Sequence, residues 1–538
     1  MKLEQISLPV NNVVLADYWE KEANIHSFFT YPFEQQSFAK RASVLQKRFY
    51  KREALAKVIR SYMERFGVSE QAENHLRELE KGAFAIVGGQ QAGVLTGPLY
   101  SVYKAITVIL LANEQRRLLD IPIVPIFWVA GEDHDIEEIN HTYTVVNGDV
   151  QKRSYSKRST KKTMASAMEI DQEMMEQLIV KVFKDFGETA YTEELLNEVL
   201  EVSRNSKTFT DFFTSLMNRL FAKYGLLMID AAYEPFRKFE SEYFERLIEH
   251  NEEISRVVVE QEQALQQAGY GKPIEASIHN ANLFYVRDGE RFLLERKDGY
   301  FVNVLAHVKL SKEELLQIAK FSPEKLSNNV VTRPLMQEMT LPVLAFVGGP
   351  GELAYWATLK RAFDVLGLEM PILAPRLNIS IVTRKIQPLL DLHQLAFEDV
   401  MDGKVTTLKE RFIASVQNQQ ALSQVDEMQK TLISQYELLN TQLVNDDVSL
   451  EKIIEKNKVF HIKQFDYLKN KISEQTLQKH DVAIRQFNTI DSEILPNNGW
   501  QERAFNPYQM LNQYGPTFID DLIQLPMTIS PQHYIVKS

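Results

Sequence analysis

Three apolar segments, each followed at once by a glycine-rich or acidic break and then by a helix-like stretch, constrain the fold of this chain most strongly. They are AFAIV (83–87) before GGQQAGVLTG, IPIVPIFWVA (121–130) before GEDHDIEEIN, and LPVLAFV (341–347) before GGPGELAYW. Near-continuous apolar strands joined by helices are typical of a parallel sheet that is buried on both faces. We therefore predict an α/β fold with a doubly wound parallel sheet, to which GLLMIDAAY (225–233) adds a fourth strand.

Two of these segments should lead directly into helices. Pro98 suits a first helical turn, where its missing N–H costs nothing, and we expect Thr96 or Gly97 to cap that helix. After the third segment we expect a helix that runs from GGPGELAYW through about Leu366.

The sequence between these segments predicts two insertions in the sheet. Residues 146–224 lose strand character and indicate a helical insertion, whereas 276–301 alternates polar and apolar residues around Asp288-Gly289 and Asp298-Gly299. Such alternation around turn residues predicts an antiparallel hairpin or meander. The predicted order is core at 1–145, helical insertion at 146–224, core strand at 225–240, second insertion with a β-hairpin at 241–330, and core again at 331–386.

The segment 387–495 is typical of a long helical arm. Its first helix carries an apolar stripe at near-heptad spacing, at Leu422, Val425, Leu432, Tyr436, Leu439 and Leu443. A turn at 445–447 separates it from a second helical run, so we predict an antiparallel coiled coil. A helical pair packed only on its own core is the alternative, but we expect a homodimer that covers the seam. Residues 496–538 should fold back onto the core.

Composition excludes several functional classes. The formal net charge of −11 argues against nucleic-acid binding, which needs a basic face. The chain has no cysteine, which removes disulfides, cysteine-zinc sites and thiol nucleophiles. The amino terminus lacks the apolar region of a secretory signal, and the longest apolar stretch, 99–112, is broken by Ser101, Lys104 and Thr107. We expect a cytoplasmic protein without membrane or nucleic-acid partners.

The three breaks should meet in one cleft, because ligands bind outside the carboxyl ends of strands in an open parallel sheet. Glycines in the first break allow the backbone to approach a ligand, although they are also ordinary turn residues. The loop has neither the Gly-Lys-Ser/Thr of a P-loop nor G-x-G-x-x-G, which argues against P-loop chemistry and NAD. Its candidate binding residues are Gly88, Gly89, Gln90, Gln91, Gly93, Thr96 and Gly97.

The second break concentrates titratable groups directly after a buried strand. Glu132, Asp133, His134 and Asp135 are candidate catalytic residues, able to supply a general base or orient an amine. Asp133 and Asp135 are also candidate ligands for Mg²⁺. The alternative is that two of the carboxylates cap the next helix. Zinc is not expected, because His134 and His141 are seven residues apart, outside the usual helical ligand spacing.

The third break and two other segments supply further candidates for substrate or nucleotide binding. Glycine, glutamate and tyrosine follow the third strand, arginine and asparagine precede it, and an aromatic–guanidinium pair lies near the carboxyl terminus. Arginine suits phosphate, and an aromatic ring can stack on a base, although surface charge and core packing are the alternatives. These candidates are Asn329, Arg333, Gly348, Gly349, Gly351, Glu352, Tyr355, Trp500 and Arg503.

Five motifs, in order along nearly the whole chain, resemble the cysteine-adding enzymes of bacillithiol biosynthesis. They are GGQQAGVLTGPLYSVYKA, FWVAGEDHDIEEIN, NLFYVRDGERF, NNVVTRPLMQEMTLPVLAFVGGPGELAYW and GWQERAFNPYQMLNQYG. The resemblance implies a Rossmann-like core similar to nucleotidylyl transferases, connecting-peptide insertions and a dimerising coiled coil. It also implies addition of cysteine to glucosaminyl malate. The HxGH signature of that superfamily is absent, since residues 89–93 read GQQAG, and KMSKS is at most echoed by Lys325-Leu326-Ser327.

Joining the carboxyl group of cysteine to a sugar amine in water needs an activated acyl group. We therefore expect ATP as the activating substrate, through an acyl-adenylate or acyl-phosphate, with Mg²⁺ as a candidate metal and no haem, flavin, NAD or zinc. The alternative function is a nucleotide-binding regulator or scaffold that dimerises through the coiled coil and has no turnover.

Overall fold

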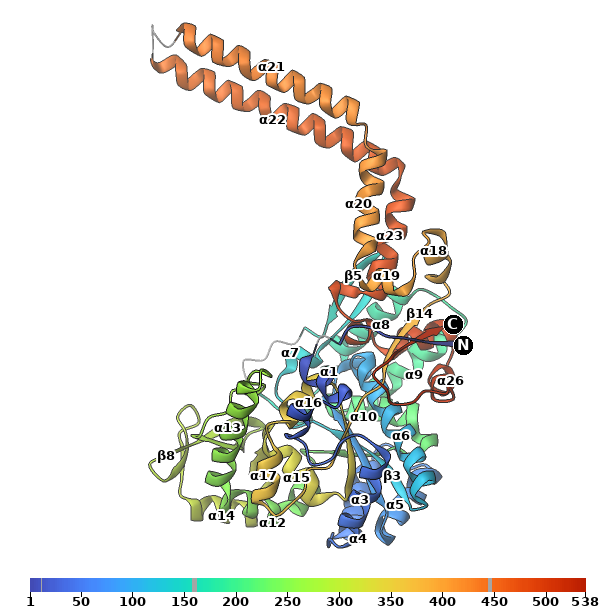
Figure 1. Ribbon diagram of the computed structural model, residues 1–538, viewed down its shortest axis with the longest axis vertical. Helices are drawn as coiled ribbons and strands as arrows, with labels where there is room; N and C mark the ends of the chain where they lie inside the picture. The colour runs from blue at the N-terminus through green and yellow to red at the C-terminus, as the bar shows by residue number, and fades with distance from the viewer. Residues whose placement is uncertain (11, 157–161, 444–447) are drawn as a thin grey trace. The chain divides into compact units, whose positions relative to one another are not determined.

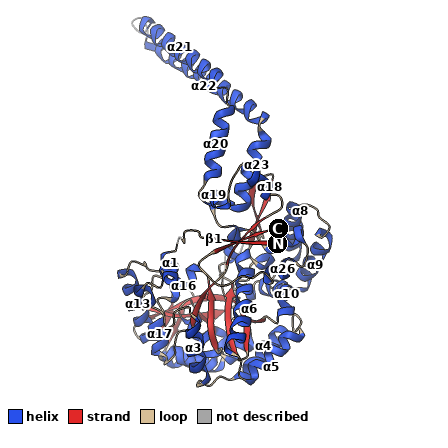
Figure 2. Cartoon of the chain, turned by 45° about the vertical axis from the view of Figure 1, so that its right-hand side comes forward, coloured by secondary structure: helices blue, strands red, loops and turns tan. Residues whose placement is uncertain are grey.

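Five parallel strands form the central sheet, in the order β13 (Ile372–Pro375), β12 (Val343–Gly348), β2 (Phe84–Gln90), β3 (Ile123–Val129) and β6 (Leu227–Asp230). The structure is a computed structural model that describes residues 1–10, 12–156, 162–443 and 448–538. Figure 2 shows the sheet inside a shell of helices. The predicted parallel sheet, including the strand in 225–233, is confirmed.

The strands are buried as their composition predicts. Every residue of β3 is buried, and in β2 only the last two residues are partly exposed. The helix α6 (Leu99–Leu119) packs on β2 and β3, and α3 (Gln35–Gln46) packs on β12 and β13 (Figure 1).

The expected cap of α6 is wrong. Thr96 and Gly97 adopt φ of +69° and +70°, and Pro98 occupies the cap position without a side-chain hydrogen bond. These left-handed conformations turn the chain sharply before the helix, so neither residue has the extended backbone of a helix N-cap.

The expected continuous helix through Leu366 is also wrong. The structure has α16 (Pro350–Trp356) and α17 (Lys360–Val365) with a break between them. At the break, the backbone N–H and Oγ1 of Thr358 both donate to Tyr355 O, at 3.0 and 2.7 Å. This local bonding diverts the backbone from the pattern that a continuing helix requires.

An antiparallel sheet forms the second insertion. Its order is β10 (Val308–Leu310), β9 (Tyr300–Asn303), β8 (Glu290–Lys297), β7 (Asn280–Arg287) and β11 (Leu326–Asn328). Asp288 and Gly289 have φ of +52° and +77°, and Asp298 and Gly299 have +52° and +79°. Two successive positive φ angles are typical of the hairpin turn that matches strand twist, so the predicted meander is confirmed.

The first insertion is not purely helical, which corrects the prediction for 146–224. The strands β4 (His141–Val146) and β5 (Asp149–Ser154) pair at its start, around Asn147 and Gly148 with φ of +54° and +86°. Asn-Gly is itself a hairpin signal that the composition of the segment obscured. The helices α8 (Gln172–Phe186), α9 (Thr192–Asn205) and α10 (Phe209–Phe221) follow.

The chain divides into two compact units. The first contains Met1–Thr144, Gln151–Ile381 and Trp500–Ser538, and the second contains Val145–Val150 and Val382–Gly499. The carboxyl-terminal segment therefore belongs to the unit that contains the central sheet. Its strand β15 (His533–Lys537) pairs antiparallel with β1 (Lys2–Ile6) and also lies beside β14 (Asn378–Val382).

The second unit contains a long helical hairpin, in which α21 (Gln419–Leu443) packs along α22 (Val448–Lys479) (Figure 1). Val425 and Ile454 are buried within this unit. The predicted turn at 445–447 lies outside the described residues. Ile453, Phe460 and Tyr467, spaced by seven residues on α22, are 63%, 58% and 59% exposed. The hairpin thus leaves an apolar stripe uncovered.

Further helices complete the fold. In the first unit they are α1 (Val13–Glu20), α2 (Ala23–His26), α4 (Arg52–Met63), α5 (Glu70–Lys81), α7 (Ile136–Ile139), α11 (Glu234–Phe239), α12 (Ser241–Glu249), α13 (Asn251–Gln267), α14 (Lys312–Phe321), α15 (Thr332–Thr340), α24 (Gln501–Ala504), α25 (Pro507–Tyr514) and α26 (Phe518–Ile523). In the second they are α18 (Gln387–Leu392), α19 (Phe397–Met401), α20 (Lys404–Val416) and α23 (Asp481–Ile494).

Candidate functional site

The order of the sheet reverses between β2 and β12. After β2 the chain adds β3 and β6 on one side, and it then returns to add β12 and β13 on the other side. In open α/β sheets the carboxyl ends of the two strands at such a reversal border the ligand site. The first break follows β2 and the third follows β12, so both predicted loops flank this point.

Lys104 of α6 joins the two loops. Its Nζ donates to Gly89 O at 2.8 Å, to Gln90 Oε1 at 3.0 Å and to Glu352 Oε2. Glu352 Oε2 also accepts the N–H of Gly349 at 2.9 Å, which holds the start of α16. The Lys104 side chain is only 2% exposed, and burial lowers its pKa. The sequence interpretation missed Lys104 as a site residue, although a lone lysine inside an apolar helix was the signal.

Two glycines of the first loop have a packing role. A Cβ at Gly88 would lie 2.7 Å from Val108 Cγ2 of α6, and one at Gly89 would lie 2.4 Å from Trp128 O of β3. These distances leave no room for a side chain, so the close approach of helix and strand already explains both glycines. The same loop nevertheless presents the side chains of Gln90 and Gln91 at the end of the strand.

The far end of the first loop is packed on itself. A Cβ at Gly93 would lie 2.7 Å from Gly97 Cα. Thr96 is fully buried, and its hydroxyl has no hydrogen-bond partner within the described residues. In this conformation Thr96 and Gly97 shape the loop, and the side chain of Thr96 has no access to solvent.

Asp133 of the second loop faces the first loop. Its Oδ2 accepts Gln91 Nε2–H at 2.7 Å, and its Oδ1 accepts the N–H of His134 at 2.7 Å and of Asp135 at 3.2 Å. Gln91 also donates to Glu138 at 2.7 Å. The three breaks therefore meet at one edge of the sheet, through Gln91–Asp133 on one side and Lys104 on the other, while their opening into one cleft stays a prediction. Asp135 itself is exposed.

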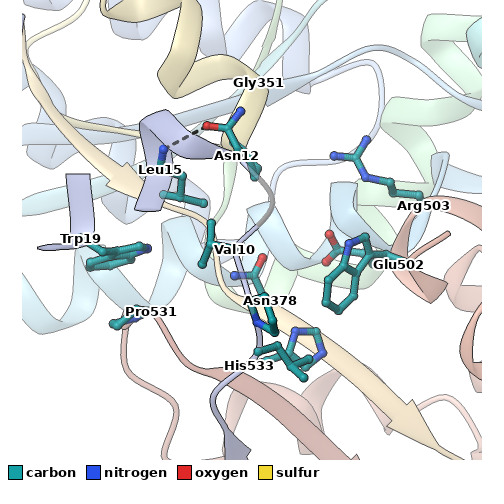
Figure 3. Close-up of a pocket in the computed structure, with 14 residues that line it drawn as sticks. Val10, Asn12, Leu15, Trp19, Gly351, Asn378, Glu502, Arg503, Pro531 and His533 are labelled. Carbon is teal, nitrogen blue, oxygen red and sulfur yellow. Dashed lines mark hydrogen bonds between the residues drawn. The ribbon is translucent and has the colours of Figure 1, made fainter. Parts of the chain in front are cut away.

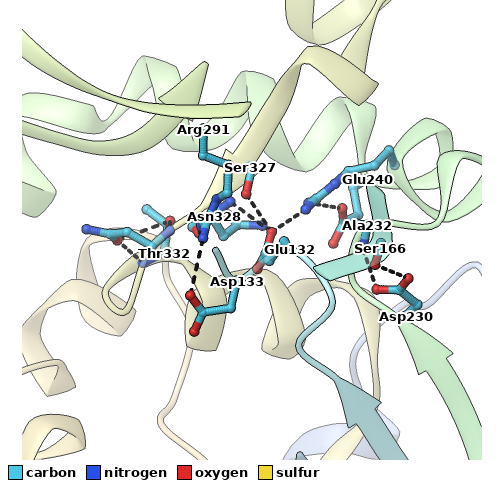
Figure 4. Close-up of polar contacts among 12 residues, drawn as sticks. Glu132, Asp133, Ser166, Asp230, Ala232, Glu240, Arg291, Ser327, Asn328 and Thr332 are labelled. Atoms are coloured by element: carbon cyan, nitrogen blue, oxygen red, sulfur yellow. Dashed lines mark hydrogen bonds and ion pairs between the residues drawn. The ribbon is translucent and has the colours of Figure 1, made fainter. Parts of the chain in front are cut away.

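Glu132 lies in a buried polar network (Figure 4). Its Oε2 accepts from Arg237, from Ser327 Oγ at 2.7 Å and from Asn328 N at 3.3 Å. Arg237 also donates to Glu240 at 2.8 Å. Burial raises the pKa of Glu240 to about 8. These contacts bury Glu132, which ties the loop after β3 to α11 and β11.

His134 contacts the antiparallel sheet of the second insertion. Arg291 Nη1 donates to His134 Nδ1 at 3.3 Å, and Arg291 Nη2 donates to Asn328 O at 2.6 Å. The Arg291 guanidinium lies 3.9 Å from the centroid of the Phe284 ring, and that ring also meets His134 edge-on. Burial, followed by the charge of Arg291, lowers the pKa of His134. Arg291 was absent from the candidates, because its distance in sequence hides this contact.

The two candidates before the third strand have different surroundings. Asn329 Oδ1 accepts the N–H of Val331 at 2.9 Å and of Thr332 at 3.1 Å, which shapes the start of α15. Arg333 donates to Gln337 at 3.0 Å and to the hydroxyl of Tyr355. Burial raises the pKa of Tyr355 to about 12, so this phenol stays protonated at neutral pH.

A cavity of about 360 Å³ adjoins the third loop (Figure 3). Gly351, Trp500 and Arg503 line it together with the amino-terminal residues Leu15 and Trp19. A Cβ at Gly351 would meet nothing within 4 Å. Within the described residues the Arg503 guanidinium has no hydrogen bond or ion pair, so it is available to an anion. The amino-terminal wall of this cavity was not foreseen from the sequence.

Asp133 and Asp135 do not by themselves form a ligand set for Mg²⁺. Across the described ranges of the chain, no group of three or more His, Asp or Glu side chains is arranged to hold a metal ion. We therefore assign no step to a metal at these residues.

Comparison with known proteins identifies similar chains over the full length. Residues 1–377 match the model for the Rossmann-like amino-terminal domain of bacillithiol biosynthesis BshC, and 379–538 match the model for its carboxyl-terminal coiled-coil domain. Relatives named "Putative cysteine ligase BshC" come from Lysinibacillus sphaericus (54% identical over 536 residues), Geobacillus sp. strain WCH70 (38% over 546) and Bacillus licheniformis (35% over 537). Each comparison covers 100% of both chains. Among the described residues, no helix is long and apolar enough to cross a membrane.

Proposed function

Because this chain belongs to the BshC family of ligases in bacillithiol biosynthesis, we propose that it joins the carboxyl group of L-cysteine to the amine of glucosaminyl malate. This amide bond completes bacillithiol. The observation that carries the proposal is the convergence of two pairs, Gln91–Asp133 and Lys104–Glu352, at the carboxyl edge of the sheet, beside the reversal of strand order. This edge combines proton-accepting and charged groups, which amide formation from an amine and an activated acid requires.

The reaction needs a leaving group on the carboxyl carbon of cysteine, and we propose that ATP provides it. A carboxylate oxygen attacks phosphorus, which gives cysteinyl adenylate and pyrophosphate, or cysteinyl phosphate and ADP. The sugar amine then attacks the carbonyl carbon, the C–N bond forms, and the C–O bond to phosphate breaks. AMP or inorganic phosphate leaves, and the amine loses one proton.

Asp133 is suited to accept that proton. Its orientation is fixed by Gln91 and by two backbone N–H groups, so little reorganisation is needed when charge moves. Arg333 and Arg503 are the proposed partners for phosphate or substrate carboxylate, and Trp500 offers an aromatic surface for a base. Lys104 holds Glu352 and the two glycine loops in place.

We also propose that the enzyme is a cytoplasmic homodimer. The lack of cysteine suits a reducing compartment. The exposed stripe of Ile453, Phe460 and Tyr467 on α22 supports dimerisation, because a second copy would remove this apolar surface from water.

The test is a reaction of the purified full chain with ATP, glucosaminyl malate and cysteine whose carboxylate carries ¹⁸O, followed by mass spectrometry. We expect bacillithiol only when ATP is present, with one ¹⁸O in AMP for an adenylate or in inorganic phosphate for an acyl phosphate. ATP binding without product would contradict the ligase proposal and favour the nucleotide-binding regulator. Product without label in either phosphate compound would refute direct activation of the carboxylate.

A further inference from the structure

Arg291 constrains how His134 can act. A guanidinium donates hydrogen bonds and does not accept them, so His134 Nδ1, 3.3 Å from Arg291 Nη1, must be the unprotonated nitrogen. Arg291 cannot turn away easily, because it is 6% exposed and stacks on Phe284. It also donates its other terminal nitrogen to Asn328 O at 2.6 Å (Figure 4). The remaining ring nitrogen of a neutral His134, Nε2, then carries the proton.

We infer that His134 serves as a neutral hydrogen-bond donor through Nε2–H, and that Arg291 is the positioning residue that sets this tautomer. His134 is half-buried, and its Nε2 has no hydrogen bond to any described residue, so the Nε2 proton is available to a ligand. The edge contact with the Phe284 ring and the hydrogen bond from Arg291, which itself lies on that ring, restrict the orientation of the imidazole.

The charges around His134 support a neutral ring. Burial and Arg291 lower its pKa the most, Lys162 lowers it further, and Asp133 and Asp135 act in the opposite direction. The net effect is a lowered pKa, so the imidazole remains neutral at the pH of the cytoplasm.

This inference rests on the proposed function for its chemical role. When the sugar amine attacks the activated carbonyl, negative charge develops on the carbonyl oxygen, and a preorganised neutral donor stabilises it. A neutral imidazole can fill this role, because a lowered pKa keeps the histidine a hydrogen-bond donor instead of a base. His134 neither gives up nor takes a proton in the step, which leaves Asp133 as the acceptor of the amine proton.

The structural part of the inference is tested by NMR on the full chain labelled with ¹⁵N-histidine, with the His134→Gln spectrum used to assign the His134 signals. We expect an unprotonated Nδ1 and a protonated Nε2 that do not change between pH 7 and 8. In Arg291→Met the ring should become free to exchange tautomers and to titrate. The control Arg287→Met, which removes an exposed arginine of the same sheet, should leave the His134 signals unchanged. Protonated Nδ1 in the wild type, or an unchanged tautomer in Arg291→Met, would overturn the inference.

The chemical part is tested by amide formation in three variants at position 134. Gln places an N–H near the position of Nε2, whereas Asn places its amide near Nδ1 and Ala has none. We expect His134→Gln to keep activity within about tenfold of the wild type, and His134→Asn and His134→Ala to lose about 10²-fold or more in kcat. A folded His134→Gln as inactive as His134→Ala would overturn the donor role. A wild type that forms no amide would refute the proposed function, while the NMR measurement still decides the tautomer.

Discussion

Gln91 Nε2 donates to Asp133 Oδ2 at 2.7 Å, although the two residues are 42 positions apart in the chain. The bond crosses between the loops after β2 and β3, which are parallel neighbours in the sheet. Asp133 is thereby held at the edge where the sheet order reverses, with its second oxygen occupied by the N–H groups of its own loop. Because hydrogen bonds to both oxygens fix the orientation of this carboxylate, it is prepared to accept a proton from a bound amine.

Asp133→Asn should therefore cut amide formation by about 10²-fold or more, the usual loss for a general base. The amide keeps the shape of the carboxylate and can still accept the loop N–H groups, so the melting temperature should change little. Glu137→Gln, an exposed acid in the first turn of α7, is the control for loss of one negative charge nearby. Equal rates of amide formation by both variants, followed by mass spectrometry, would show that Asp133 only shapes its loop.

Gly89→Ala should destabilise the fold by about 1–3 kcal/mol, because the added Cβ would lie 2.4 Å from Trp128 O and force the strands apart. Gly351→Ala is the matched control in the third loop, where a Cβ meets nothing within 4 Å. That variant should be neutral or slightly stabilising. Denaturant unfolding of both proteins measures the difference, and similar midpoints would mean that the loop after β2 yields without strain.

Glu240→Gln should change how stability depends on pH. Burial raises the pKa of Glu240 from 4.5 to about 8, so the folded chain keeps a proton that the unfolded chain releases above pH 4.5. This contribution to stability is complete below pH 4.5 and is lost as pH rises towards 8, with a slope of up to about 1.4 kcal/mol per pH unit.

Denaturant unfolding between pH 5 and 8 provides the test of that slope. Wild type should lose stability more steeply with rising pH than Glu240→Gln, whose amide does not titrate. Glu249→Gln, at the exposed acid that ends α12, the helix that Glu240 precedes, should follow the wild type. Parallel curves for all three proteins would mean that Glu240 is ionised in the fold.

Ile453→Glu with Phe460→Glu should convert a dimer into a monomer. Both side chains are largely exposed on α22, so the charges should leave the hairpin itself intact while they oppose contact with a second copy. Val482→Glu, on α23 and 65% exposed, is the control outside the stripe. Light scattering at micromolar concentration measures the oligomeric state of each protein. A monomeric wild type would contradict the dimer, and a dimeric double variant would move the interface to another surface.

Much of the fold was predictable from local sequence. Apolar segments such as 121–130 predicted buried parallel strands, and Asp288-Gly289 predicted the hairpin turn, because side-chain periodicity and the cost of positive φ act over a few residues. The shared edge of the three loops followed from topology alone, since the carboxyl ends of parallel strands coincide. The Asn147-Gly148 hairpin carried the same local signal and was missed within a helix-rich segment.

Other features depend on tertiary structure. Lys104 and Glu352 are 248 positions apart, and Arg291 reaches His134 across 157 positions. No local pattern identifies these partners, because a buried charge is paired with whatever group the packed strands and insertions bring within hydrogen-bond distance. The sequence by itself determined the strands, the turns and the edge at which the loops gather. Only the folded chain decided which side chains meet there, since that depends on strand order and on how closely glycines let the elements approach.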